Sequence, residues 1–291
     1  MPECSVYYQP ESISEAVNFL ASSERTLKPL AGGTDIVPAM RKGEMNIDGL
    51  VDLSKIPDIR SIKIEDNEIK LGSLCTFAQI ERSPLIQTKA SLLAQAAGAV
   101  GSPQIRSLGT IGGNIANASP AADTVTAFIA LDAKARLEST NGTRSVLVSE
   151  LLCGVGKTNI SSNEIIAEIS FKIPSENNQS GFIKLGRRKA LAIARMNLAM
   201  IITLHDGLID FARVSLGAVG PNPSRNTNLE EFLIGKKPSD SLIDSFAQFA
   251  GEEVSRMLGS RASAAYKCEA VKGIVRDLSS RLFLGSEQVV I

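Results

Sequence analysis

Two glycine-rich stretches hold the residues whose types and spacing suggest chemistry. The first is the turn AGGTD at 31–35, and the second is GSPQIRSLGTIGGNIANASPAAD at 101–123. Such stretches add little to a hydrophobic core, so their glycines serve either positive φ angles or a close approach of a ligand to the main chain. Each turn is able to aim several backbone N–H groups at one point. We therefore expect a large anionic ligand, for which a dinucleotide pyrophosphate is the natural candidate.

Histidine and cysteine offer little further chemistry. His205 is the single histidine of the 291 residues, and the Asp206-Gly207 pair that follows it is typical of a hairpin turn. Acid–base or hydrolytic chemistry built on histidine is thus nearly excluded, and the reaction is expected to belong to a cofactor. The cysteines are too far apart for a disulfide framework, a zinc site or an iron–sulfur cluster. We expect buried, reduced thiols at Cys4, Cys75, Cys153 and Cys268.

Composition indicates a folded protein without a nucleic-acid or membrane partner. Hydrophobic residues make up 44% of the chain, and the 31 Lys and Arg residues balance the 31 Asp and Glu residues, so no net charge attracts it to nucleic acid. No apolar run approaches the roughly 20 residues that span a bilayer. The N-terminal sequence lacks the basic start and apolar block of a secretory signal. These features predict a cytoplasmic protein.

The elements around the first glycine turn follow from local patterns. The sequence SISE is a capping box and predicts a helix at 12–22. A strand at 28–30 should run directly into the turn, and a helical segment at 36–41 should follow it. Strand, glycine turn and helix in this order point free N–H groups at an anion. A strand at 49–53 completes a small α/β unit.

The second glycine stretch should lie between two helices. Apolar residues at 92–100 predict a buried helix that ends at Gly101, and Ser119 with Pro120 predicts the start of a helix that ends near Leu131. Two hairpins and one further strand are expected at 62–71, 135–148 and 164–173.

A change of pattern separates the C-terminal part of the chain. Pro174 and the polar run 175–180 form the best domain boundary. Beyond it, strands are followed by helices, which indicates an α+β unit. The expected strands are 181–186, 196–204 and 208–217, and the expected helices are 227–234, 239–258 and 263–284.

The two glycine motifs resemble those of a known family. AGGTD at 31–35, TIGGN at 110–114 and SPAAD at 119–123 are similar to the flavin-binding motifs of the flavoprotein (medium) subunits of molybdenum hydroxylases, which include the xanthine and carbon monoxide dehydrogenases. The sequence LGAVGP at 216–221, with Arg225, resembles the family's C-terminal signature. The resemblance covers nearly the whole chain and extends in particular to the FAD subunit of nicotinate dehydrogenase.

The resemblance implies an α+β fold in two domains. Residues 1–175 would form a PCMH-type FAD-binding domain with subdomains at about 1–55 and 56–175. Residues 176–291 would form a domain of the CO dehydrogenase flavoprotein C-terminal type, in which a three-stranded antiparallel sheet packs with helices. The bound cofactor would be FAD.

The motifs also imply which residues contact FAD. The segment 29–36 would wrap the pyrophosphate, with Gly32 and Gly33 permitting an approach that any Cβ would block, and the segment 110–114 would bind it from the other side. The residues expected at the cofactor are Pro29, Leu30, Ala31, Gly32, Gly33, Thr34, Asp35, Ile36, Gly101, Thr110, Ile111, Gly112, Gly113, Asn114, Asp123, Lys157, Ile166 and Lys184.

Some of these assignments have structural alternatives. Asp123 would accept hydrogen bonds from ribose hydroxyls, or it is a charge that favours a helix N-terminus. Lys184 would stabilise reduced flavin at its N1–O2 edge, whereas the neighbouring Arg187 and Arg188 are equally well explained as a solvated basic face. Ile166 or Ile169 would pack on the cofactor or only in a sheet, and Lys157 would reach a phosphate or ribose.

By the same resemblance, the chain would transfer electrons rather than convert a substrate. A small partner subunit with [2Fe–2S] clusters would supply electrons that originate at a large molybdopterin subunit, and NAD(P)+ or another acceptor would receive them. No catalytic side chain and no metal site are expected in this chain. A self-contained flavin-dependent oxidoreductase, and a scaffold that has lost FAD, remain as alternatives.

Overall fold

The computed structural model describes residues 5–188 and 191–285, which form two compact units. Unit 1 consists of 1–80, 102–119 and 132–173, and unit 2 consists of 81–101, 120–131 and 174–291. The chain therefore alternates between the units several times. The glycine turns at 31–35 and 110–114 belong to unit 1, whereas Gly101, Asp123 and Lys184 belong to unit 2.

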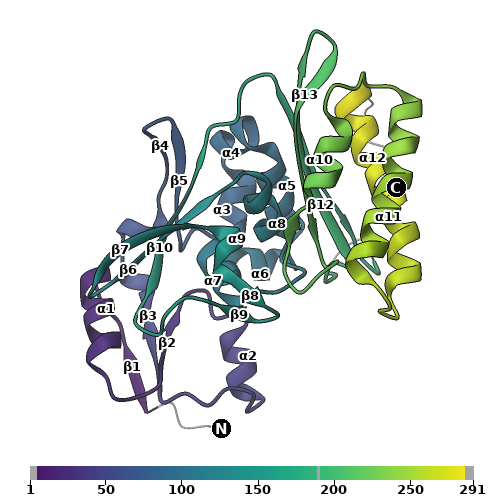
Figure 1. The fold of residues 1–291 in the computed structure, drawn as a ribbon. Helices are drawn as coiled ribbons and strands as arrows, with labels where there is room; N and C mark the ends of the chain where they lie inside the picture. The colour runs from purple at the N-terminus through teal and green to yellow at the C-terminus, as the bar shows by residue number, and fades with distance from the viewer. Residues whose placement is uncertain (1–4, 189–190, 286–291) are drawn as a thin grey trace. The chain divides into compact units, whose positions relative to one another are not determined.

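A parallel three-stranded sheet lies at the start of unit 1, with strand order β1-β3-β2 (Figure 1). The predicted helix α1 begins after Ser12, whose hydroxyl accepts a hydrogen bond from the Glu15 N–H group. The apolar side of α1, with Val17 and Leu20, packs in one core cluster with residues of β2 and β3. The elements are β1 (Val6–Tyr8), α1 (Ile13–Ser22), β2 (Leu27–Leu30), α2 (Ile36–Arg41) and β3 (Gly49–Asp52).

An antiparallel five-stranded sheet completes unit 1, with strand order β4-β5-β10-β6-β7. Both predicted hairpins are confirmed. Asp66 and Asn67 adopt positive φ angles of 54° and 60° in the first turn, and Gly142 has a φ of 116° at the second, as tight hairpin turns require. The strands are β4 (Ile62–Glu65), β5 (Glu68–Gly72), β6 (Lys134–Ser139), β7 (Gly142–Leu147) and β10 (Ile165–Lys172), and the short elements beside them are η1 (Leu53–Lys55), η2 (Asp58–Arg60), α9 (Val148–Leu151), β8 (Leu152–Gly154) and β9 (Lys157–Thr158).

An ion pair links the edge strand β7 to the residue just before β10. Arg144 donates from Nε and from an Nη to the two carboxylate oxygens of Glu164, at 2.6 and 2.8 Å. The hydrogen bond from Arg144 is the main reason that the pKa of Glu164 lies below its ordinary value. Because the folded-state pKa is depressed, this stabilisation is present above the unfolded pKa of about 4.3 and is lost as the pH falls through the folded pKa.

We predict that Glu164→Gln lowers the free energy of unfolding at pH 7 by about 1 kcal/mol, a modest value because the Arg144 side chain is 38% exposed. The difference from the natural protein should shrink between about pH 5 and pH 3, where the natural Glu164 becomes protonated as well. Urea titrations at a series of pH values measure this difference. A difference that stays constant over that range would show that the charge of Glu164 is irrelevant.

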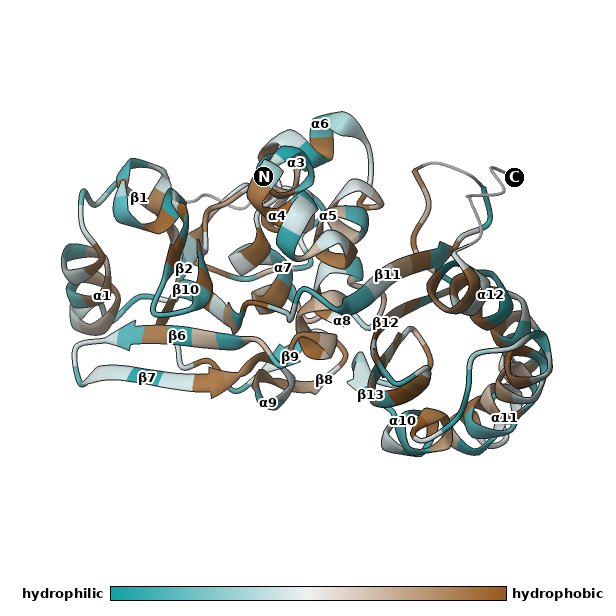
Figure 2. Cartoon of the chain, turned by 90° about the horizontal axis from the view of Figure 1, so that it is seen from above, coloured by the Kyte–Doolittle hydropathy of each residue, from teal (hydrophilic) through white to brown (hydrophobic). Residues whose placement is uncertain are grey.

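Unit 2 is built on an antiparallel sheet of strand order β11-β12-β13-β14. The three predicted strands are present, and the two-residue strand β14, which no apolar pattern marks, pairs with β13 as a fourth. Figure 2 shows brown and teal residues alternating along the long helices α11 and α12, as expected for helices with one buried face. The elements are β11 (Asn178–Leu185), β12 (Met196–His205), β13 (Leu208–Gly217), β14 (Ser224–Arg225), α10 (Thr227–Leu233), α11 (Asp240–Leu258) and α12 (Ala264–Leu284).

Two earlier segments of the chain add helices to unit 2. The helices α4 (Pro84–Lys89) and α5 (Ser91–Gly98) precede Gly101, and α8 (Asp123–Ala130) follows the second glycine turn. All eight residues of α8 are buried, and the helix packs against β12 and β13. The remaining helices are α3 (Phe77–Arg82), α6 (Pro103–Leu108) and α7 (Ile111–Asn117).

The predicted start of α8 at Ser119 is wrong, because the helix begins at Asp123. Ala122 is extended, with ψ at 109°, and its carbonyl accepts a helical hydrogen bond from Thr126. The Pro120 carbonyl instead accepts from the N–H group of Ala218 at 2.7 Å. A tertiary contact with the loop after β13 therefore replaces the local helix signal.

Two predictions about single residues have mixed outcomes. His205 and Asp206-Gly207 do form the turn between β12 and β13, with Asp206 and Gly207 at positive φ. Cys75 is buried, and burial raises the pKa of its thiol to about 11. The expectation of a buried thiol is wrong for Cys153, which is exposed, and for Cys268, which is partly exposed, and Cys4 lies outside the described residues. Across residues 5–188 and 191–285, none of the helices combines the length and the apolar character of a membrane span.

Candidate functional site

The first glycine turn connects β2 to α2, as predicted. Gly33 has a φ of 71°, a conformation that side chains rarely adopt, and its carbonyl accepts from Val37 as α2 starts. Gly32 is required for a different reason, because a Cβ at this position would lie 1.9 Å from the carbonyl oxygen of Leu108. Gly32 therefore makes room for the chain itself, and this contact accounts for the glycine without a ligand.

The second glycine turn is the first turn of α7, a helix that the sequence patterns did not reveal. Thr110 is its N-cap and accepts a hydrogen bond from Gly113 at 3.2 Å. A Cβ on Gly112 would lie 2.6 Å from Ser73 Cβ and 2.8 Å from Ser73 O, so this glycine is needed for packing. Gly113 differs, since a Cβ there would meet only Thr110 Oγ1, at 3.0 Å, and Ala31 Cβ, at 3.9 Å.

The main-chain donors of the second turn are already used. Ile111 donates to the carbonyl of Cys75 at 3.0 Å and Gly112 to that of Ser73 at 2.9 Å, while Gly113 donates to Thr110. The expectation that this turn aims several free N–H groups at a ligand is thus wrong. What it offers instead is a partly exposed surface without side chain at Gly113.

The two turns lie against each other within unit 1. Asn117, at the end of α7, donates from Nδ2 to Asp35 Oδ1 at 3.2 Å. Ala31 is the nearest residue to Gly113 outside the turn of α7, and the residues from Pro29 to Thr34 are all partly exposed. An accessible turn and an open glycine surface are therefore neighbours, although 80 residues separate them in the sequence.

A buried polar cluster in unit 2 contains two further predicted residues. Lys184 on β11 donates from Nζ to Asp123 Oδ2 at 2.6 Å and to the Ala99 carbonyl at 2.8 Å. The other carboxylate oxygen, Asp123 Oδ1, accepts from Asn197 Nδ2 on β12 at 2.8 Å. Asp123 is only 4% exposed. Burial raises the pKa of this carboxyl, and the attraction and hydrogen bonds from Lys184 and Asn197 oppose that rise.

This cluster retains hydrogen-bonding capacity for a ligand. An ammonium group has three donors, of which Lys184 uses two, and each carboxylate oxygen of Asp123 has a second acceptor position. The Lys184 side chain is only 13% exposed, so it is largely buried.

The other predicted residues are placed as follows. Gly101 follows α5 in unit 2 with a φ of 47°. Lys157 is exposed on β9, next to Gly156, whose N–H group bonds to the carbonyl of Ala118 after α7. Ile166 is buried in β10 and Ile111 in α7, so packing explains both side chains without a ligand.

Two residues of the unit 2 cluster were missed by sequence reasoning. Asn197 is fully buried in β12, and Thr126 is fully buried in α8. The available signal was a single amide side chain inside the apolar run MNLAMII. The sequence alone does not show the role of this asparagine, which depends on its position beside Asp123 in the folded protein.

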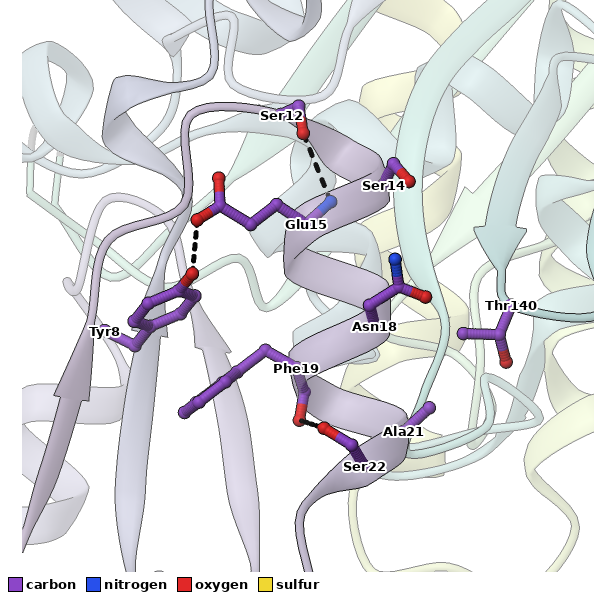
Figure 3. Close-up of a pocket in the computed structure, with 9 residues that line it drawn as sticks. All are labelled: Tyr8, Ser12, Ser14, Glu15, Asn18, Phe19, Ala21, Ser22 and Thr140. Carbon is purple, nitrogen blue, oxygen red and sulfur yellow. Dashed lines mark hydrogen bonds between the residues drawn. The ribbon is translucent and has the colours of Figure 1, made fainter.

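A surface hollow in unit 1 lies away from both glycine turns (Figure 3). Figure 3 shows Tyr8 bonded to Glu15, and the Glu15 N–H group bonded to Ser12. Because its polar groups bond to one another and stabilise the start of α1, the hollow is explained by the fold. It is lined by Tyr8, Ser12, Ser14, Glu15, Asn18, Phe19, Ala21, Ser22 and Thr140.

Comparison with known proteins assigns most of the chain. Residues 2–175 match the model of the FAD binding domain in molybdopterin dehydrogenase, and residues 182–282 match that of the CO dehydrogenase flavoprotein C-terminal domain. The FAD subunit of nicotinate dehydrogenase from Eubacterium barkeri is 34% identical over 94% of both chains. The medium chain of glyceraldehyde dehydrogenase from Sulfolobus acidocaldarius is 30% identical over 93% of this chain and 95% of its own length.

A solved structure agrees with these matches. A chain of carbon monoxide dehydrogenase from Hydrogenophaga pseudoflava superposes with a TM-score of 0.87 at 28% identity, over 95% of this chain and 96% of that one. The predicted α+β fold, the FAD cofactor and the oxidoreductase class are thereby confirmed. The chain belongs to the family of FAD-binding medium subunits of molybdenum hydroxylases.

Proposed function

We propose that this chain receives electrons from an iron–sulfur partner subunit and passes them to NAD(P)+ or another acceptor. Bound FAD supplies the redox chemistry, because a flavin accepts two electrons and releases them to a separate acceptor. The residues of this chain bind and orient the cofactor. No acid–base side chain is needed for that task, which fits a chain with one exposed histidine at a hairpin turn.

The observation that best supports cofactor binding in unit 1 is the difference among the four motif glycines. Close contacts with the rest of the chain explain Gly32 and Gly112, and a positive φ angle explains Gly33. Gly113 has neither a backbone contact of this kind nor a positive φ angle. In the proposed arrangement the pyrophosphate lies over Gly113 and accepts hydrogen bonds from the turn 31–35 and from Ile36 at the start of α2, since Val37 already donates to Gly33 and Pro38 has no N–H group. Lys157 would supply a nearby cation.

In unit 2, the proposed contacts with FAD use the remaining hydrogen-bonding capacity of Lys184 and Asp123. The third donor of Lys184 would contact the N1–O2 edge of the flavin, where a cation stabilises the reduced form, and Asp123 would accept from a hydroxyl of the cofactor. Gly101, with its positive φ, would line the same region. We also propose the domain boundary near residue 175 and a cytoplasmic location.

Electron transfer is testable in the complex isolated through a tagged copy of this chain. We predict that a [2Fe–2S] subunit and a molybdopterin subunit co-purify with it, and that the visible flavin absorbance bleaches when the reduced iron–sulfur subunit is mixed in without oxygen. NAD(P)+ should restore the absorbance. If the chain instead purifies alone and oxidises an organic substrate by itself, it is a self-contained flavin oxidoreductase and the proposal is wrong.

A further inference from the structure

A hydrogen-bonded chain of buried side chains continues behind Asp123. Asn197 is fully buried, donates from Nδ2 to Asp123 Oδ1 at 2.8 Å and accepts at Oδ1 from the Thr126 hydroxyl at 2.8 Å. Thr126 is also fully buried. The residues Thr126, Asn197, Asp123 and Lys184 therefore form one series across α8, β12 and β11, all within unit 2.

The Asp123 carboxylate determines how the Asn197 amide is oriented, and the Thr126 hydroxyl holds the other end of the amide. A carboxylate accepts but does not donate, so the amide must present its NH₂ group to Asp123 and its oxygen to a donor on the other side. Thr126 provides that donor. A flipped amide would place its oxygen against the Asp123 carboxylate, which has no hydrogen to donate, and this costs free energy in an interior.

Gly217, at the end of β13, leaves the space that this amide fills. A Cβ on Gly217 would lie 2.0 Å from Asn197 Oδ1 and 2.5 Å from Thr126 Oγ1. The Asn197–Thr126 contact is therefore built into the packing of three elements rather than being a chance pairing of two flexible groups. Gly217 is the first glycine of the LGAVGP sequence. The contact between Asn197 and Thr126 therefore explains why this position has no side chain.

We propose that Asn197, held in place by its hydrogen bond with Thr126, is a positioning residue that fixes the Asp123 carboxylate, and through it the Lys184 ammonium, for contact with bound FAD. The inference rests on the proposed contacts of Asp123 and Lys184 with the cofactor. Asn197 and Thr126 touch no cofactor atom themselves in this arrangement. Their effect on FAD is transmitted by the orientation of the ion pair.

The decisive variants are Thr126→Val and Thr126→Ser, because valine keeps the shape without the hydroxyl and serine keeps the hydroxyl. We expect Thr126→Val to weaken FAD binding about tenfold and Asn197→Ala to weaken it about tenfold to a hundredfold, as loss of a hydrogen bond to a charged group implies. Thr126→Ser should bind FAD nearly as the natural protein does. The reduction potential of bound FAD should fall in Thr126→Val and Asn197→Ala, because a displaced Lys184 stabilises the reduced flavin less.

Asn226→Ala is the matched control. Asn226 is a buried asparagine of the same unit that donates to a buried carboxylate, Glu253, at 3.3 Å and caps α10. Its replacement should lower the melting temperature of the complex without changing the FAD dissociation constant or the potential.

The outcomes separate this inference from the proposed function. If Lys184→Met, in its folded fraction, binds FAD with unchanged affinity and potential, the proposed cofactor contact is wrong. If Lys184→Met alters both while Thr126→Val and Asn197→Ala alter neither, the contact stands and the positioning role is wrong. If Thr126→Val and Thr126→Ser weaken FAD binding equally, the hydroxyl of Thr126 has no positioning role.

Discussion

Replacing Gly113 by valine should give a folded protein that no longer retains FAD. A Cβ at this position would meet only Thr110 Oγ1, at 3.0 Å, and Ala31 Cβ, at 3.9 Å, so we expect the fold to tolerate a side chain here. Replacement of a glycine within α7 also removes a weak helix former. The same side chain would occupy the open surface beside Ala31, where the proposed pyrophosphate lies. Visible flavin absorbance of the purified protein, together with its melting temperature, measures the two effects separately.

Gly112→Ala is the matched control in the same helical turn. Its Cβ would lie 2.6 Å from Ser73 Cβ and close to the Ser73 carbonyl, so the packing between α7 and the end of β5 must shift. We expect a loss of about 1–3 kcal/mol in the free energy of unfolding, typical of an overpacked site. A Gly113→Val protein that keeps its flavin, or one that unfolds as readily as Gly112→Ala, would contradict the proposed cofactor site.

Replacing Lys184 by methionine should destabilise the protein by about 3–5 kcal/mol, the usual cost of leaving one partner of a buried ion pair without the other. Asp123 is 4% exposed, so water cannot replace the missing ammonium group. Its pKa, already raised by burial, should rise further. Urea unfolding measures the loss, which should become smaller at acidic pH as Asp123 becomes protonated.

The double variant Lys184→Met with Asp123→Asn tests the cause of that loss. Removing both charges avoids the unpaired carboxylate, so most of the stability should return while FAD affinity does not. Lys63→Met serves as the control, since Lys63 pairs with Glu65 at 3.1 Å and both side chains are about half exposed; its cost should stay below about 1 kcal/mol. A double variant no more stable than Lys184→Met would show that the ion pair is not the source of the effect.

The sequence predicted the elements whose signals are local. The helix start at Ser12, the hairpin turns at Asp66-Asn67 and Asp206-Gly207, and the long amphipathic helices are confirmed because short-range patterns determine them. The start of α8 was mispredicted, since the bond between Ala218 and Pro120 depends on residues almost 100 positions apart. No local pattern contains that contact.

The candidate site was predicted as a set of residues rather than as a set of roles. The sequence does not distinguish the reasons for which a glycine is present. Gly33 adopts a positive φ angle, Gly32 lies in contact with backbone, and Gly113 leaves an open surface. Only the neighbours of each position separate these cases. Asn197 shows the same limit, because its meaning arises from the pairing of β12 with β11 and from the position of α8.

The chain alternates between its two units, so a truncation near residue 175 does not separate one complete unit from the other. Helix α8 comes before residue 175, yet β12 and β13, which pack against it, come after that residue. A polypeptide truncated at residue 175 would present the apolar faces of α5 and α8 to solvent and leave Asp123 without Lys184 and Asn197. If Asp123 and Lys184 contact FAD as proposed, complete cofactor binding requires residues beyond 175, and an interrupted translation product would be prone to aggregate rather than to bind flavin.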